Sequence, residues 1–408
     1  MTDKKKILFV AGVYSIHSAR WINQLLDSDC EIHVASGVMP WSGVNPEQQT
    51  GIFYLPFPEV YPFQIRKKIS RWGNYYMRKI IAKFPKYFEN IQVMYLFLLI
   101  KIIKPDIIHS LGLNNNWKNY CLPVKKVLDL LPEHKRPPWI YSTWGADLDF
   151  YAKMSDQNFQ EVSHILASVD YIITECKRDA ELSRTMGFRG EYLGALPAFG
   201  GTNWEHISQF RSNGAVSSRK IIFLKGRDCQ EGGDPVGRAM TAMEGFSQCK
   251  DLLYGYQIMI AQGSSVVVRA AKKLSINTGI KIKILPYTTY EEILELMGSS
   301  RIFISLTVND GLPSSLVEAM ALGVFPIHSD LSPIREWINH KQNGLLVPAE
   351  DSTAFAEALR LALSDDMLVN TAANINAAII KERLADTLIK QKVLEIYDKI
   401  AGNGHKSK

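Results

Sequence analysis

The stretch from Ser305 to Ser329, SLTVNDGLPSSLVEAMALGVFPIHS, constrains the fold more than any other part of the chain. Its order of residue types predicts a strand, a tight loop, a helix and a second strand. The loop contains the turn cluster Asn309-Asp310-Gly311, and Pro313 suits a first helical turn because its missing N–H is not needed there. Gly323 suits the position just after the helix. The stretch therefore predicts a strand–helix–strand unit of an α/β protein.

Two acids flank the start of this helix. Asp310 lies in the loop, and Glu318 lies inside the helix. A rise of ~1.5 Å per residue keeps them within roughly 10 Å of each other. The helix N-terminus between them offers N–H groups and a partial positive charge, which suit a phosphate. A phosphate with a carboxylate on each side matches a nucleotide sugar, which has hydroxyls on both sides of its diphosphate. The alternative is an ordinary strand–helix–strand unit with two surface acids.

The motif DGLPSSLVEAMALG resembles the E-x(7)-E region of retaining glycosyltransferases of family 4 (group 1), which have the GT-B fold. Asp310 stands in place of the first Glu, and Glu318 is the second. The resemblance implies that Asp310 contacts the hydroxyls of the donor sugar and that Glu318 contacts the ribose. It also implies a donor-binding role for the residues between them, namely Gly311, Leu312, Pro313, Ser314 and Ser315.

The length of 408 residues fits two domains, and the alternation of strand and helix patterns restarts after a Gly-, Ser- and Asn-rich segment. We expect an α/β protein with two Rossmann-like domains, over residues 1–200 and 219–380, joined by a linker over 201–218. The resemblance implies that the domains face each other across a cleft, with the acceptor on the first and the nucleotide sugar on the second. It also implies that a helix in the last segment, 381–408, packs back on the first domain before a loose tail.

Composition excludes several classes of protein. The net charge of +6 permits an anionic partner without identifying one. The five cysteines are scattered, so the sequence predicts neither a zinc site nor a disulfide framework. The apolar run near the N-terminus is strand-length and has no cleavage site, and no uncharged run reaches the ~20 residues of a membrane-spanning helix. We therefore expect a cytoplasmic protein.

Candidate site residues follow the strands of the first half. A predicted strand over 6–11 leads to Gly12, which lets the backbone turn close to a ligand, and to a helix with Ser18 as candidate N-cap. The lack of G-x-G-x-x-G argues against a dinucleotide site. The segment SIHSARW resembles the first loop and helix of family 4 enzymes, which implies that His17 and Arg20 approach the donor phosphates and the acceptor. His17 also fits a hydrogen bond at the helix start, and His109, at a later strand end, fits either an acceptor contact or a structural histidine.

The sequence Trp144-Gly145-Ala146-Asp147 resembles the acceptor-side loop of the same family, in which many members have His at the position of Trp144. The resemblance implies that Trp144 and Asp147 lie at the acceptor site. Asp147 and Asp149 also spell D-x-D, the metal motif of the other glycosyltransferase fold. Because GT-B enzymes need no such metal, we expect no metal site and no cofactor beside the nucleotide-sugar substrate.

The second half carries the candidate diphosphate ligands. Lys225-Gly226-Arg227 follows a predicted strand, and the resemblance implies that Arg227 neutralises the donor diphosphate. A guanidinium suits bidentate phosphate contact. The family has a lysine a few residues later, where this chain has Gly232, so Lys225 or Arg238 is the candidate substitute. The resemblance places Tyr287, after a later strand, at the nucleobase.

The segment 61–88 is basic, rich in aromatic residues and free of acids. This composition suits an anionic membrane surface, and many family 4 enzymes bind the inner leaflet in this way to reach lipid-linked acceptors. A solvated helical face is one alternative, and a nucleic-acid face is a weaker one because no nucleic-acid motif accompanies the segment. We expect this segment to hold the protein on the inner face of the membrane, and we expect no nucleic-acid partner.

Together these features predict a hexosyltransferase-type enzyme. It would move a sugar from a nucleotide-diphosphate donor, most commonly a UDP-sugar in this family, to a glycan or lipid-linked acceptor with retention. The pathway would be cell-surface polysaccharide or lipopolysaccharide biosynthesis. The catalytic residues would be Arg227, Asp310 and Glu318. The alternatives are a UDP-sugar 2-epimerase of the same fold and an inactive scaffold.

Overall fold

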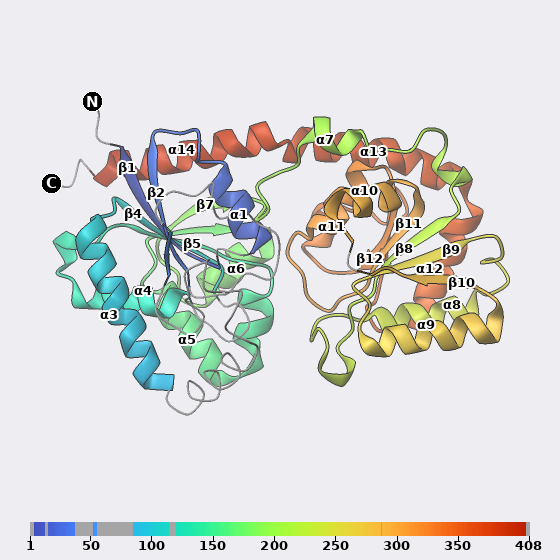
Figure 1. The fold of residues 1–408 in the computed structure, drawn as a ribbon, viewed down its shortest axis with the longest axis horizontal. Helices are drawn as coiled ribbons and strands as arrows, with labels where there is room; N and C mark the ends of the chain where they lie inside the picture. The colour runs from blue at the N-terminus through green and yellow to red at the C-terminus, as the bar shows by residue number, and fades with distance from the viewer. Residues whose placement is uncertain are drawn as a thin grey trace, which may run out of the picture. The chain divides into compact units, whose positions relative to one another are not determined.

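The computed structural model describes residues 4–12, 15–36, 52–54, 85–113, 120–286 and 288–404. The chain divides into two compact units, Met1–Gly200 together with Ile389–Lys408, and Gly201–Leu388 (Figure 1). Each unit contains one parallel sheet covered by helices. The residues that return to the first unit begin at Ile389, inside the last helix.

The first unit is built on a seven-stranded parallel sheet. Its strand order is β3-β2-β1-β4-β5-β6-β7, so the direction of strand addition reverses between β1 and β4. Open parallel sheets bind ligands at such a reversal, outside the carboxyl ends of the strands. The strands are β1 (Lys5–Val10), β2 (Cys30–Ser36), β3 (Ile52–Tyr54), β4 (Ile107–Leu111), β5 (Trp139–Ser142), β6 (Tyr171–Thr174) and β7 (Glu191–Ala195).

Helices cover both faces of this sheet. They are α1 (Ile16–Asn23), α3 (Pro85–Ile103), α4 (Cys121–Leu130), α5 (Asp156–Leu166), α6 (Lys177–Thr185) and α14 (Asp386–Gly404), the last joining the first unit from Ile389 onward. Leu8 and Val10 of β1 belong to a buried cluster shared with α3, α4 and α5. Phe9, which points the opposite way, contacts the rings of His109 and Tyr397. The second face of the sheet therefore packs against α14.

The second unit is built on a six-stranded parallel sheet in the order β10-β9-β8-β11-β12-β13. The direction of strand addition reverses between β8 and β11, so this sheet repeats the plan of the first. The strands are β8 (Ile221–Lys225), β9 (Gln257–Ala261), β10 (Lys281–Ile284), β11 (Ser300–Ser305), β12 (Phe325–Ser329) and β13 (Leu345–Val347).

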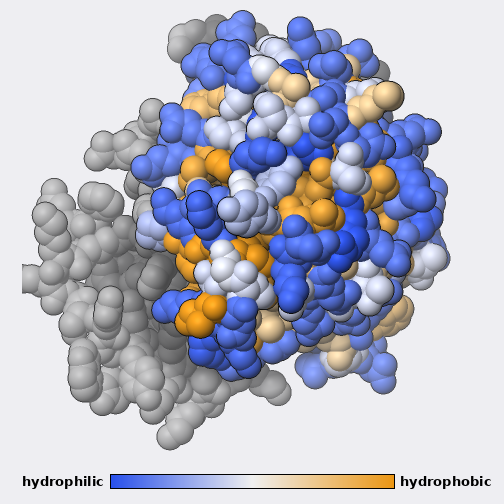
Figure 2. Space-filling view, turned by 90° about the vertical axis from the view of Figure 1, so that its right-hand side faces the viewer, coloured by the Kyte–Doolittle hydropathy of each residue, from blue (hydrophilic) through white to orange (hydrophobic). Residues whose placement is uncertain are grey.

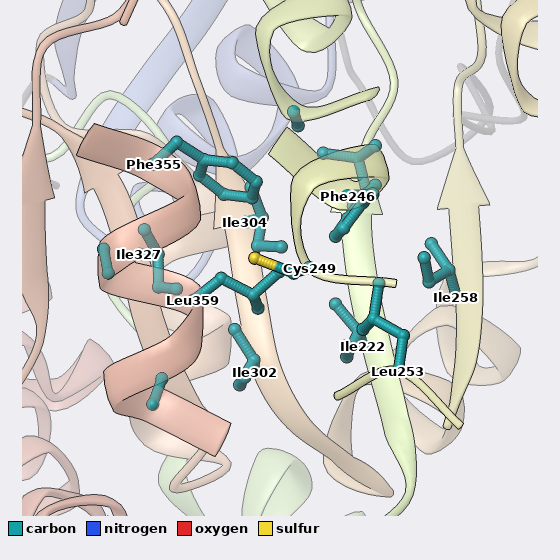
Figure 3. Close-up of a cluster of buried hydrophobic side chains, with 14 of the residues drawn as sticks. Ile222, Phe246, Cys249, Leu253, Ile258, Ile302, Ile304, Ile327, Phe355 and Leu359 are labelled. Carbon is teal, nitrogen blue, oxygen red and sulfur yellow. The ribbon is translucent and has the colours of Figure 1, made fainter. Parts of the chain in front are cut away.

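The core of the second unit lies between its sheet and the helices of one face. The helices of the whole unit are α7 (Trp204–Ser208), α8 (Ala239–Gln248), α9 (Ser265–Thr278), α10 (Tyr290–Gly298), α11 (Ser314–Ala321), α12 (Ser352–Ser364) and α13 (Asp366–Leu384). Figure 3 shows Phe246 of α8 and Phe355 of α12 meeting edge to face beside Ile304, with ring centroids 5.6 Å apart. Alternate residues of β8, β11 and β12 point into this cluster, so the residues between them point to the other face.

The structure corrects several expected boundaries. Ser15, and not Ser18, is the N-cap of α1, and Ser18 is buried inside the helix. The segment expected to be an irregular linker contains α7, whose N-cap is Asn203. The last segment contains two helices, which are separated at Ala385. These short features were missed because a cap or a five-residue helix leaves no periodic pattern in the sequence.

The surface is mostly polar on the face drawn in Figure 2, where hydrophobic residues gather in smaller patches between hydrophilic ones. None of the helices in the described ranges is long and apolar enough to cross a membrane. Helix α3 nevertheless exposes Met94, Leu98 and Ile102, by 60%, 49% and 76%. Residues four apart share one side of a helix, so these three form an apolar stripe.

Candidate functional site

Charged side chains gather where the strand order of the second sheet reverses. The register pairs Leu224 with Ile304 and Ser305 with His328, so Lys225, Ser305 and His328 lie in a row across the carboxyl ends of β8, β11 and β12. Since they alternate with core residues, their side chains point away from the cluster of Figure 3. This is the edge at which open parallel sheets bind ligands.

Lys225 is the centre of this arrangement. Burial lowers the pKa of its ammonium group; the carboxylates of Asp310, Asp234 and Glu318 oppose this shift, and Arg227 adds to it. Among the described residues, no hydrogen-bond or ion-pair partner contacts its Nζ atom. Lys225 is half-buried, and an ammonium group with no protein partner at this position suits an incoming anion.

The two arginines considered with Lys225 differ in their engagement. Arg227 pairs with Asp234, with 3.1 Å between Nη1 and Oδ2, and its side chain remains 46% exposed. Arg238 donates from Nε to Glu350 at 2.6 Å and from Nη1 to two backbone carbonyls. Arg238 is therefore committed to contacts within the protein, whereas Arg227 is accessible to a ligand.

Gly226, between the two candidate cations, is required by close packing. A Cβ atom there would lie 2.5 Å from a side-chain atom of Ile260 and 2.8 Å from the Cα atom of Gly263. Any larger residue would push β8 away from the loop after β9. The glycine thus fixes the backbone that presents Lys225 and Arg227.

The amino end of α11 supplies hydrogen-bond donors. Its N-cap is Pro313, which offers no side-chain cap. No described acceptor binds the N–H groups of Ser314 or Ser315, and the buried hydroxyl of Ser315 also lacks a partner. Leu312 and Gly311, just before, are buried. The first turn of α11 therefore combines unused donors with the positive end of the helix dipole. Gly323 ends the helix with φ 75°, the left-handed conformation expected of it.

The acids and a histidine complete this part of the site. Glu318 accepts a hydrogen bond of 3.1 Å from the hydroxyl of Tyr290, and Asp310 accepts one of 3.0 Å from the N–H of Gly311. His328 is fully buried, its Nδ1 lies 3.3 Å from the carbonyl of Ser329, and its Nε2 has no partner among the described residues. Burial lowers the pKa of His328 to about 4, so the imidazole is neutral near pH 7. The sequence did not single out His328, because one histidine inside an apolar strand matches no motif.

In the first unit, Trp144 and His17 lie together at the carboxyl edge of the sheet. Their ring centroids are 5.8 Å apart, in an edge-to-face arrangement. The indole also covers Gly112, where a Cβ atom would lie 2.9 Å from the ring. Arg20 is half-buried and lies three residues after His17 on α1, so both side chains share one side of that helix. Gly12, buried at the end of β1, lies at the same reversal of strand order.

Asp147 holds the loop that carries Trp144. Its Oδ2 accepts hydrogen bonds from the N–H groups of Leu113 and Trp144, both 2.9 Å long, and from the hydroxyl of Tyr141 at 2.8 Å. Burial raises the pKa of this carboxyl to about 7, although the hydrogen bonds act in the opposite direction. The carboxylate thus ties together the segments that follow β4 and β5, and it contacts the protein's own backbone rather than an open surface.

His109 lies in the core of the first unit, which removes it from the candidate contact surface. It is fully buried, with Nδ1 2.6 Å from the hydroxyl of Tyr397 and Nε2 2.8 Å from the hydroxyl of Ser142. Both ring nitrogens are therefore occupied inside the protein. The predicted acceptor contact has no exposed atom in this structure, and the structural alternative explains His109.

The D-x-D pair is engaged in internal contacts. Asp149 pairs with Arg178 at 3.0 Å and also with Lys153, while Asp147 binds the backbone as described. Within the described ranges, no group of three or more His, Cys, Asp or Glu side chains is placed to hold a metal ion. Tyr287 lies outside the described residues, as does most of the segment 61–88, of which only the backbone from Pro85 onward is described, within α3.

Two family models match the chain, one in each unit. A model described as glycosyl transferase 4-like matches residues 6–175, and a model described as glycosyl transferases group 1 matches residues 239–382. The chain belongs to the group 1 glycosyltransferases, which have the GT-B fold.

Curated relatives of this group 1 glycosyltransferase match over shorter segments. It is 30% identical over 112 residues to N,N'-diacetylbacillosaminyl-diphospho-undecaprenol alpha-1,3-N-acetylgalactosaminyltransferase of Campylobacter jejuni, which is 28% of this chain and 30% of that protein. It is 34% identical over 91 residues to phosphatidyl-myo-inositol mannosyltransferase of Mycobacterium leprae, which is 22% of this chain and 24% of that protein. The chain therefore spans less than a third of the length of these relatives.

Solved structures support the fold over nearly the full chain. Anabaena HepE in complex with UDP and glucose superimposes with a TM-score of 0.68 and 14% identity, covering 97% of this chain and 100% of that one. At this identity the likeness establishes the fold alone. The two parallel-sheet units of this glycosyltransferase thus form the fold that the sequence predicted.

Proposed function

We propose that this glycosyltransferase transfers a hexose from a nucleoside diphosphate donor, a UDP-sugar in the first instance, to a hydroxyl group of a glycan or lipid-linked acceptor. We assign donor binding to the second unit and acceptor binding to the first. One observation carries the proposal: the unpartnered ammonium of Lys225 lies among Arg227, Asp310 and Glu318, where the strand order reverses. This arrangement offers positive charge to a diphosphate and carboxylates to the hydroxyls of a nucleotide sugar.

The residues divide the work by charge. Lys225, Arg227 and the N–H groups of Ser314 and Ser315 stabilise the charge that develops on the leaving diphosphate, the kind of term that usually contributes most to catalysis. Lys225 takes the role of the family's missing lysine, because Arg238 is bound to Glu350. By the family resemblance, Asp310 binds sugar hydroxyls, Glu318 binds the ribose, and the first turn of α11 binds the phosphates.

The transfer we propose retains the configuration of the sugar. The bond between the anomeric carbon and the diphosphate oxygen breaks, and the acceptor oxygen bonds to the same face of that carbon. The proton of the acceptor hydroxyl passes to a diphosphate oxygen, so the products are the glycoside and a free nucleoside diphosphate. This route follows the family resemblance and uses no carboxylate nucleophile. His17, Trp144 and Arg20 are the acceptor-side residues we assign.

A thermal-shift screen with UDP, GDP and ADP tests the proposal. At least one nucleotide should raise the melting temperature of the wild type, because a ligand that binds only the folded state stabilises it. Glu318→Ala should lose most of this shift and all turnover, whereas Glu244→Ala on the exposed side of α8 should behave as wild type. If none of the nucleotides raises the melting temperature, the result would favour the inactive scaffold. Nucleotide release from a UDP-sugar that needs no acceptor would favour the 2-epimerase.

A lipid-linked acceptor and a membrane surface belong to the same proposal. The names of two relatives contain a diphospho-undecaprenol and a phosphatidylinositol acceptor, and a third is an amylovoran biosynthesis glycosyltransferase of Erwinia amylovora. We assign this chain to cell-surface polysaccharide or lipopolysaccharide biosynthesis on the inner face of the membrane. The apolar stripe of Met94, Leu98 and Ile102 follows the basic segment 61–88 directly in the chain, which suits insertion beside anionic headgroups.

Sedimentation with vesicles of phosphatidylglycerol and phosphatidylcholine tests the membrane assignment. Changing Lys67, Lys68 and Arg71 together to Ser should weaken binding about a hundredfold, at ~1 kcal/mol for each basic side chain near the lipid. Leu98→Ser with Ile102→Ser should weaken it as well. The matched control changes three exposed lysines of the second unit, Lys272, Lys273 and Lys281, to Ser and should bind as wild type. Equal binding of all these proteins would favour the alternative interpretation, in which the segment 61–88 is a solvated face.

A further inference from the structure

Tyr290 occupies a rigid position at the start of α10. Its neighbour Thr289 forms a capping box: the Thr289 hydroxyl accepts from the N–H of Glu292, and the Glu292 carboxylate accepts from the N–H of Thr289 at 2.8 Å. This reciprocal cap fixes the first turn of the helix. The side chain of Tyr290 is half-buried and donates its hydroxyl proton to Oε1 of Glu318 at 3.1 Å.

A second aromatic ring supports that of Tyr290. The imidazole of His206, on α7, stacks on the phenol ring with 6.5 Å between centroids and 21° between planes. His206 itself is held by an edge-to-face contact with Phe210. Asn203 caps α7 by accepting from the N–H of His206 at 2.8 Å. The phenol ring is therefore supported by α7 in addition to its hydrogen bond with Glu318 of α11.

The far end of α10 is anchored to the same segment. A Cβ atom at Gly298 would lie 1.9 Å from the carbonyl oxygen of Phe210, so the helix and this backbone meet without room for a side chain. The hydroxyls of Ser212 and Ser299 lie 3.2 Å apart. Helix α10 is thus fixed at both ends by residues 203–212, and its position determines where the Tyr290 hydroxyl lies.

We propose that Tyr290 is a positioning residue, which orients the Glu318 carboxylate toward the ribose hydroxyls of the donor, and that His206 holds Tyr290 in place. The inference rests on the proposed function, because it assumes a nucleoside diphosphate beside Glu318. A carboxylate accepts up to about four hydrogen bonds, so the bond from Tyr290 fixes the group without exhausting its capacity. A carboxylate held in one orientation has less freedom to lose when the ligand binds.

Binding of a nucleotide with and without ribose hydroxyls tests this role. UDP, GDP and ADP are screened first, and the tightest is compared with its 2′,3′-dideoxy analogue by isothermal titration calorimetry. Tyr290→Phe keeps the ring and removes the hydroxyl. It should weaken binding of the natural nucleotide about tenfold, the usual size of a hydrogen bond to a charged group. Binding of the dideoxy analogue should stay as in the wild type.

The double variant separates positioning from a general structural effect. In a Glu318→Gln background, Tyr290→Phe should cause no further loss, because its effect acts through Glu318. His206→Ala should weaken binding of the natural nucleotide by about threefold through the loss of ring contact. Tyr254→Phe is the matched control, since that tyrosine is 95% exposed. The role of Tyr290 would be overturned if Tyr290→Phe weakened binding of both nucleotides equally, or if it caused a further loss of affinity in the Glu318→Gln background. The role of His206 would be overturned if His206→Ala bound the natural nucleotide as tightly as the wild type. If the wild type binds no nucleoside diphosphate, the proposed function itself fails.

Discussion

At the scale of single residues, the candidate site contains a half-buried lysine whose pKa is lowered. Lys225 ends a buried strand, and no described residue forms a hydrogen bond or ion pair with its ammonium group. The nearby carboxylates lower the cost of this position but do not remove it, since the net pKa shift is still downward. A perturbed pKa is typical of residues at functional sites.

The lowered pKa of Lys225 predicts how nucleotide binding depends on pH. Only the protonated amine attracts a diphosphate, so affinity should fall as pH rises through the lowered pKa, at a lower pH than for an exposed lysine. Lys225→Met should bind about tenfold to a hundredfold more weakly, as expected for the loss of one charge-assisted contact. Its affinity should show no such alkaline fall. Calorimetric titration with UDP at pH 7 to 10 measures both, and comparing the two proteins in the same buffers cancels the titration of UDP itself. Parallel pH profiles would contradict the role of Lys225.

The proximity of candidate site residues was predictable from the sequence where a motif is local. Lys225 and Glu318 lie in short motifs, so their neighbourhood could be predicted, and the structure places both around one point. The choice between Lys225 and Arg238 required the partner Glu350, which lies 112 residues from Arg238. The sequence left His109 open between an acceptor contact and a structural role, because its partner Tyr397 lies 288 residues away, beyond the reach of any local pattern.

At the scale of elements, the strand predicted over 6–11 is observed as β1 (Lys5–Val10), displaced by one residue. Buried parallel strands are continuous apolar runs, which are visible without other information. Helix α3 differs, since it begins at Pro85 although the apolar pattern begins at Ile91. The first turns carry basic and aromatic residues, which hide helical periodicity. Tertiary contacts such as the stacking of α7 on α10 are likewise invisible in a sequence.

The loop element held by Asp147 should make stability depend on pH. The folded-state pKa of about 7 lies above the ordinary value of 3.8, so the folded chain binds the extra proton between these pH values. The contribution to unfolding free energy therefore falls as pH rises from about 4 to about 7, by as much as about 4 kcal/mol at ~1.4 kcal/mol per pKa unit. The side chain of Asp147→Asn does not titrate. The unfolding free energy of this variant minus that of the wild type should therefore be larger at pH 8 than at pH 5.

Urea unfolding at these two pH values measures the difference. Asp27→Asn, at a carboxylate whose side chain is 84% exposed, is the matched control and should shift equally with the wild type at both. Other carboxyls also contribute to the slope of the wild type, so the comparison uses the change in the difference between variant and wild type. A difference that is constant from pH 5 to pH 8 would mean that the Asp147 carboxyl is ionised in the folded protein throughout.

At the scale of the whole molecule, the two sheets repeat one plan and carry different candidate site residues. Both place their candidate residues where the strand order reverses, at β1/β4 and at β8/β11. The first reversal presents an aromatic pair, and the second presents a cation among acids. The last helix completes the first unit, because from Ile389 onward it packs against the sheet formed by residues near the start of the chain.

Tyr397 of α14 should stabilise the first unit through its hydrogen bonds to Trp21 and His109. Its buried hydroxyl accepts from Nε1 of Trp21 at 3.1 Å, and its own proton is available for Nδ1 of His109 at 2.6 Å. Tyr397→Phe leaves both groups buried without a partner, which should lower the unfolding free energy by about 2 kcal/mol. Tyr254→Phe, at an exposed position, should leave it unchanged.

Hydrogen exchange followed by mass spectrometry locates the effect. In Tyr397→Phe, peptides from α14 and from β1 and β4 should exchange faster, since α14 opens locally more often once its buried hydrogen bonds to the sheet are lost. Peptides from β8 and β11 should keep the wild-type rate, because they belong to the other compact unit. Uniformly faster exchange across both units would indicate that the chain unfolds as one cooperative body, and Tyr397 would then contribute to global rather than to first-unit stability.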